Sequence, residues 1–150
     1  MRRSAAAFVG TIVVVLAIGA GGVSAKPGGV PAIPLNAEQE TQPVDSDASG
    51  FFSYTIEGDQ LCYTLEVRNL TTQPVGAHIH PGQRNEAGGI AVALITPPAT
   101  TSTVSECITA TEGGNLTPAE LAAIAADPGA FYVNVHTTQY RPGEIRGQLK

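Results

Sequence analysis

The strongest constraint on the fold is a period-two alternation of apolar and polar side chains. Apolar residues occupy every second position over 52–56 and again over 61–67, and Glu57-Gly58-Asp59 separates the two runs. Successive side chains of a strand point to opposite faces of a sheet, so each run predicts a half-buried strand. The polar, glycine-containing segment between them predicts a hairpin.

Further short strands are predicted along the rest of the chain. Each is rich in β-branched or apolar residues and is bounded by Gly or Pro. These segments are 77–80, 90–95, 101–109, 131–137 and 144–149. Residues 32–35 are also apolar, but Pro34 cannot donate to a ladder, so we expect an edge strand there at most.

One short helix is predicted before the last two strands. Thr117 fits the N-cap, Pro118 the first helical position, and Glu120 the returning member of a capping box. Leu121, Ile124 and Ala125 would pack inward. Many short strands and one helix predict an all-β fold, either an antiparallel β-sandwich or a flattened Greek-key barrel.

The first 25 residues are typical of a secretory signal peptide. Arg2-Arg3 is followed by a long uncharged stretch that ends in small residues at Ala25. The alternative is an uncleaved signal anchor. With cleavage we expect a protein that is secreted or held in the cell envelope, with no membrane span. Residues 26–50 are a Pro/Gly-rich N-terminal segment, and one domain is expected over 32–149.

Composition limits the partners. The chain has 8 Lys and Arg against 13 Asp and Glu, a formal net charge of −5. An acidic protein of this kind is poorly suited to nucleic acid or to an anionic membrane surface. We therefore expect an extracellular protein or a small ligand as partner, and no nucleic acid.

The two cysteines, Cys62 and Cys107, have two interpretations. In an oxidising compartment an even pair most simply forms one disulfide. The alternative is two free thiols that serve as metal ligands or nucleophiles.

All three histidines lie in two of the predicted strands. His78 and His80 are two residues apart and share a face, opposite Ile79. His136 lies on the face opposite Val133 and Val135, together with Asn134. If the strands meet, three imidazoles converge and could hold zinc or copper.

A simpler alternative is that these histidines only hold the end of the sheet together. They would then bond to the backbone and to Asn134, Glu144 or Arg146. Arg146 and Gln148 are expected to face outward, either as a charged strand face paired with Glu144 or Glu66 or as part of a recognition surface with the histidines.

No catalytic arrangement is recognisable. Ser and Thr are common, but none occupies a nucleophile elbow, and the carboxylates show no pairing. Gly88-Gly89 precedes a strand and lacks the Lys of a phosphate loop, which indicates a turn. We expect no enzyme.

Three separated motifs resemble the chordin-type domain, CHRD. They are Ala77-His78-Ile79-His80, Phe131-Tyr132-Val133-Asn134-Val135-His136-Thr137 and Gly143-Glu144-Ile145-Arg146-Gly147-Gln148-Leu149. The resemblance runs from about residue 32 to 149, and Cys62 and Cys107 stand where many bacterial members carry a pair. It implies an extracellular β-sandwich module to which no catalysis is generally assigned.

The His-x-His strand is also similar to a copper-ligand strand of copper–zinc superoxide dismutase. Three histidines are too few for a bimetallic site, but His78, His80 and His136 could hold one copper or zinc ion. We therefore expect an immunoglobulin-like or dismutase-like sandwich that acts as a secreted binding module, with Asn134, Glu144 and Arg146 in its binding surface. The competing classes are a mononuclear metalloprotein and a purely structural envelope protein.

Overall fold

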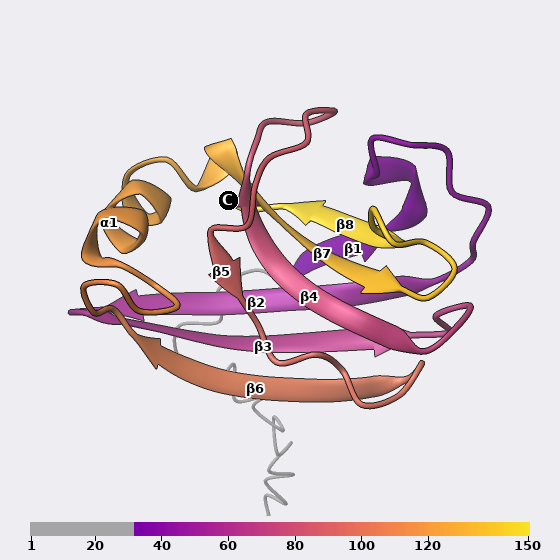
Figure 1. Ribbon diagram of the computed structural model, residues 1–150, viewed down its shortest axis with the longest axis horizontal. Coiled ribbons are helices and arrows are strands. Elements are labelled where there is room, and N and C mark those ends of the chain that lie inside the picture. The colour runs from indigo at the N-terminus through magenta and orange to yellow at the C-terminus, as the bar shows by residue number, and fades with distance from the viewer. Residues whose placement is uncertain (1–31) are drawn as a thin grey trace, which may run out of the picture.

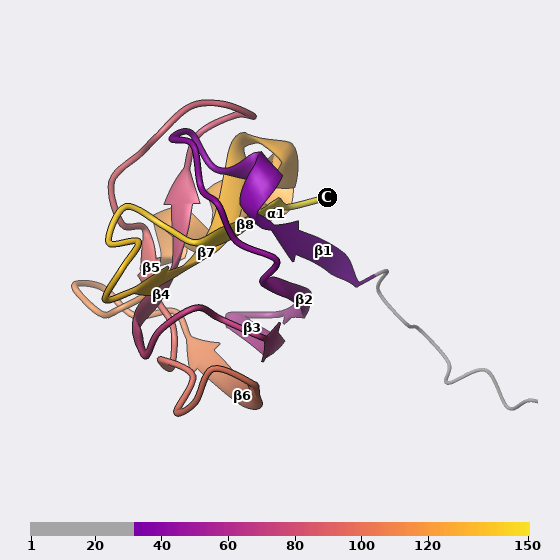
Figure 2. The same ribbon diagram turned by 90° about the vertical axis from the view of Figure 1, so that its right-hand side faces the viewer.

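A single antiparallel sheet of eight strands forms the body of the described chain. The computed structural model describes residues 32–150. The order of strands is β5-β4-β7-β8-β1-β2-β3-β6, and the sheet curls into a half-barrel (Figures 1 and 2). The elements are β1 Ile33–Asn36, η1 Ala37–Gln39, β2 Ser49–Glu57, β3 Gln60–Arg68, β4 Pro74–Pro81, β5 Val92–Ala93, β6 Ser102–Thr109, α1 Pro118–Ala126, η2 Pro128–Ala130, β7 Phe131–Thr137 and β8 Ile145–Gln148.

The hydrophobic core fills the inside of the curl. Phe52 and Leu65 come from the β2–β3 half, and Ile79, Val133 and Ile145 come from the β4–β7–β8 half. All five are fully buried. The alternating pattern therefore has the physical cause expected from the sequence, because one face of each strand packs against the opposite half of the same sheet.

The expected all-β class with one short helix is confirmed. The β2–β3 hairpin pairs from Ser49↔Arg68 to Glu57↔Gln60. Helix α1 begins with the predicted capping box, in which the Thr117 side chain accepts from the Glu120 backbone and the Glu120 side chain accepts from the Thr117 backbone. Leu121 and Ile124 are buried, but Ala125 is exposed, so the prediction for Ala125 was wrong.

Two strand predictions need correction. β1 is not an edge strand, because it lies between β8 and β2. Its ladder to β8 is registered only at Asn36↔Arg146, two residues beyond Pro34, so the missing N–H of Pro34 does not interrupt it. The strand predicted over residues 90–95 is reduced to Val92–Ala93, which pairs with Ile79 and His78. The signal peptide predicted for residues 1–25 lies outside the described residues.

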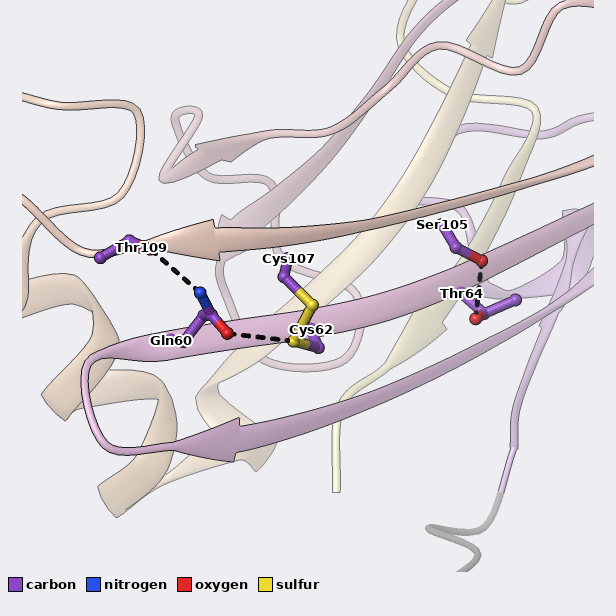
Figure 3. Close-up of a disulfide and its surroundings, with 6 residues drawn as sticks. All are labelled: Gln60, Cys62, Thr64, Ser105, Cys107 and Thr109. Carbon is purple, nitrogen blue, oxygen red and sulfur yellow. Dashed lines mark hydrogen bonds between the residues drawn. A yellow bond between two sulfur atoms is a disulfide. The ribbon is translucent and has the colours of Figure 1, made fainter.

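A disulfide joins Cys62 to Cys107, as the sequence predicted. The two residues are direct partners in the ladder between β3 and the edge strand β6 (Figure 3). Thr64 and Ser105 are bonded through their hydroxyls two positions further along, at 2.9 Å. The disulfide thus fixes the register of an edge strand, and it is compatible with an oxidising, extracellular location.

The described chain also bears on membrane topology. None of its helices is long and apolar enough to cross a bilayer.

Candidate metal centre

The histidines converge because β4 and β7 are neighbours in the sheet. The two strands lie side by side and run antiparallel (Figure 1). Gly76 is opposite His136, His78 is opposite Asn134, and His80 is opposite Tyr132. The histidine side chains, with those of Asn134 and Tyr132, lie on the face away from the core, since Ile79 and Val133 point inward. One metal-ligating atom from each of His78, His80 and His136 lies within 4.8 Å of the others.

Each histidine has one buried ring nitrogen without a hydrogen-bond partner. These buried atoms are Nδ1 of His78, Nε2 of His80 and Nε2 of His136. Buried polar atoms in native proteins are nearly always paired, so three unpartnered nitrogens in one cluster require an explanation. A metal ion held among the rings is one candidate explanation, because one ligand atom of each ring lies in the same cluster.

Backbone carbonyls set the proton positions on two of the rings. Nδ1 of His80 lies 2.9 Å from the Gly89 carbonyl oxygen and 3.1 Å from that of Gly88. Nδ1 of His136 lies 2.8 Å from the carbonyl oxygen of Arg141. A carbonyl only accepts, so both Nδ1 atoms carry the proton and both Nε2 atoms keep a free lone pair.

The electrostatics of the cluster favour neutral rings. Burial, followed by the neighbouring His136 and His80, lowers the pKa of His78 to about 4. Burial is also the largest cause that lowers the pKa of His80 and that of His136. At neutral pH the three rings are therefore uncharged, which is the form that binds metal.

Gly76 makes room for the rings, and sequence reasoning did not identify it. A Cβ at this position would lie 3.0 Å from Cε1 of His78 and 3.6 Å from Cδ2 of His136. Gly76 is two residues before His78 and shares its face, so Gly-x-His-x-His was the available signal. Gly88, which was predicted only as a turn residue, approaches Pro81 so closely that a Cβ would overlap the Pro81 carbonyl oxygen.

Arg146 contacts the cluster through the Tyr132 ring and is not a surface residue. Its guanidinium lies 3.3 Å from the centre of the Tyr132 ring, and that ring stacks on His80 at 5.0 Å. The same guanidinium donates to the carbonyl oxygens of Glu86 and Gln83 at 2.7 and 2.8 Å. Arg146 therefore holds the 82–91 loop, whose glycine carbonyls orient His80.

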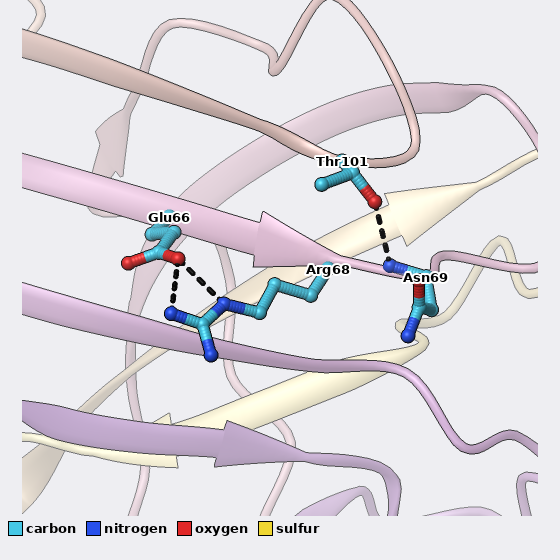
Figure 4. Close-up of polar contacts among 4 residues, drawn as sticks. All are labelled: Glu66, Arg68, Asn69 and Thr101. Carbon is cyan, nitrogen blue, oxygen red and sulfur yellow. Dashed lines mark hydrogen bonds and ion pairs between the residues drawn. The ribbon is translucent and has the colours of Figure 1, made fainter.

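Arg146 lies on the histidine face of β8, as expected, but it is buried there and is not exposed. The side chain is 1% exposed because the 82–91 loop covers the outer face of β8. The suggested pairing with Glu66 is wrong as well, since Glu66 forms its ion pair with Arg68 on the same strand (Figure 4). Gln148 is only partly exposed and donates to the carbonyl oxygens of Gly82, Gly129 and Phe131.

Asn134 and Glu144 have different places. Asn134 lies between the histidines and Arg146 in the sheet and donates to the Pro142 carbonyl oxygen at 3.4 Å, while its Oδ1 has no partner. Glu144 is fully buried and accepts from Ser46 and from the backbone and hydroxyl of Thr71. Glu144 thus links the segment around Ser46 to the segment around Thr71, which are distant from it in the sequence.

Glu40 is a further acid, half-buried, that sequence reasoning missed. Burial raises its pKa to about 7, against the opposing effects of Arg146, Asn134 and the Thr41 backbone. Its Oε1 has no hydrogen-bond partner. Nothing in the polar loop around Glu40 distinguishes it in the sequence, because its burial arises only when this loop covers the β7–β8 face.

Replacing Arg146 by Lys should loosen the 82–91 loop. Lysine keeps the charge but loses the planar fork and the stack on Tyr132. We expect the Gly88 amide, which donates to the Tyr132 hydroxyl at 3.3 Å, to exchange its hydrogen about tenfold faster. Hydrogen–deuterium exchange by NMR measures this rate. An unchanged rate at Gly88 would show that Arg146 does not hold the loop.

Replacing Glu40 by Gln should change how stability depends on pH. A carboxyl whose pKa rises from 4.5 to about 7 on folding stabilises the protein fully below 4.5, and this contribution is lost as pH rises through 7. We expect the wild type to lose about 1–2 kcal/mol more than Glu40→Gln between pH 5 and pH 8, after a discount for partial exposure. Urea unfolding at both pH values measures the difference, and parallel pH profiles would contradict the assignment.

One of three comparisons with known proteins found a match. The model of the CHRD domain matches residues 32–149, which is nearly all of the described chain. Searches of curated proteins and of solved structures gave no significant match. The chain belongs to the CHRD domain family.

Proposed function

We propose that this CHRD domain is an extracellular binding module that holds one zinc or copper(II) ion through His78, His80 and His136. The observation that carries the proposal is the set of three unpartnered ring nitrogens in one cluster. Three neutral imidazoles on adjacent strands are a donor set that suits either metal. We propose binding without catalysis.

The surroundings of the rings support a metal site over a purely structural cluster. His80 and His136 contact backbone carbonyls through Nδ1 alone, so the backbone does not hold Nε2 of either ring. Carbonyl contacts of this kind fix the tautomer of metal-ligating histidines. The hydrogen bonds therefore leave free the nitrogen that a metal needs.

The metal-binding test is direct because the chain has only three histidines. We expect untagged protein to bind one equivalent of zinc or copper(II) in isothermal titration calorimetry. His136→Ala should lower the affinity at least about a hundredfold, because a three-ligand site loses one of its donors. A protein that binds neither metal, or a variant with unchanged affinity, would contradict the proposal.

Gly76→Ala provides a variant that keeps every histidine. The added methyl group would crowd His78 and His136, so we expect the affinity for zinc to fall about tenfold. Gly129→Ala is the matched control, since a Cβ there has its nearest neighbour at 3.4 Å and the residue is in η2. If the two variants bind zinc equally well, the packing of the rings does not determine affinity.

A further inference from the structure

The three histidines lie in a hollow that is open to solvent. Its volume is about 300 Å³, and the histidines share its lining with Val75, Gly76, Ile90 and Arg141. Such a volume admits a small organic molecule beside the rings. The hollow therefore offers more space than one metal ion needs.

The proposed metal site would carry a net positive charge, which a bound anion would balance. Zinc or copper(II) brings two positive charges, and the three ligands are neutral rings. The residues that line the hollow include no carboxylate, and Arg141 is a permanent cation among them. A dication in a partly desolvated site is costly without a compensating charge.

Two exposed aliphatic side chains, which we call the aliphatic rim, line the hollow together with Arg141. Val75 is 46% exposed and Ile90 is 60% exposed, and both belong to the lining. They come from separate segments, one in β4 and the other just before β5. Large aliphatic side chains on both segments beside a cationic centre suit a ligand with an anionic head and an aliphatic body.

We propose that the open coordination position takes the carboxylate of a small aliphatic acid, whose hydrocarbon chain packs on Val75 and Ile90. This inference rests on the metal site proposed above and names the ligand of that site. The carboxylate oxygen supplies the fourth donor and neutralises part of the charge, and Arg141 adds attraction for the anion. The hydrocarbon chain strengthens binding because its apolar surface is removed from water.

Calorimetry on zinc-loaded protein, with acetate and hexanoate as probes, tests this inference. We expect both acids to bind to the loaded protein, and hexanoate to bind about tenfold more tightly because its longer chain reaches the aliphatic rim. Metal-free protein should bind neither acid. Replacing Val75 and Ile90 together by Ser should remove the advantage of hexanoate and leave acetate unchanged.

Arg141→Gln tests the charge contribution. The exchange retains the backbone carbonyl that holds His136, and we expect the loaded variant to bind both acids about fivefold more weakly. Arg68→Gln on β3 is the control, because Arg68 is an exposed arginine that pairs with Glu66. Equal effects of the two substitutions would overturn the role of Arg141.

Three results would overturn the proposal as a whole. If zinc binds at one equivalent but neither acid binds, the metal site stands and water or hydroxide completes it. If metal-free protein binds the acids equally well, the metal is not their anchor. If zinc itself does not bind, the metal site fails, and the ligand proposed for it fails with it.

Discussion

The antiparallel register between β4 and β7 is the constraint on which the site depends. It places Gly76 opposite His136 and His78 opposite Asn134, and so brings together residues 60 and 56 positions apart in the sequence. Side chains alternate across a strand, so a shift by one residue would send the rings into the core and Ile79 into solvent. Burial of Ile79 and Val133 therefore fixes the position of the histidines.

The outer face of these strands has become a second, polar interior. Arg146, Tyr132 and His80 stack there, and the 82–91 loop closes over them. Hydrogen bonds and stacking fix the side chains on this face, as aliphatic packing fixes them on the core face. They hold three rings with their lone pairs free, an arrangement that suits metal binding better than structural support alone.

The sequence predicted the parts of this molecule that local patterns control. Alternation gave the β2–β3 hairpin, and the Thr117–Glu120 spacing gave the start of α1. The shared face of His78, His80 and His136 also followed from strand periodicity. By contrast, the burial of Arg146 and Glu40 depends on loops that cross the sheet, and no local pattern encodes where such loops lie. Pro34 was misleading because the effect of a proline depends on which residues of a strand are paired.

The ring nitrogens themselves test the central claim most directly. Nitrogen-15 NMR of the metal-free protein at neutral pH should show all three rings neutral, with the proton on Nδ1 of His80 and His136 and a free lone pair on each Nε2. On addition of one equivalent of zinc, the resonances of Nε2 of His80, Nε2 of His136 and Nδ1 of His78 should shift together. Protonated rings, or nitrogen resonances that zinc leaves unchanged, would contradict the account.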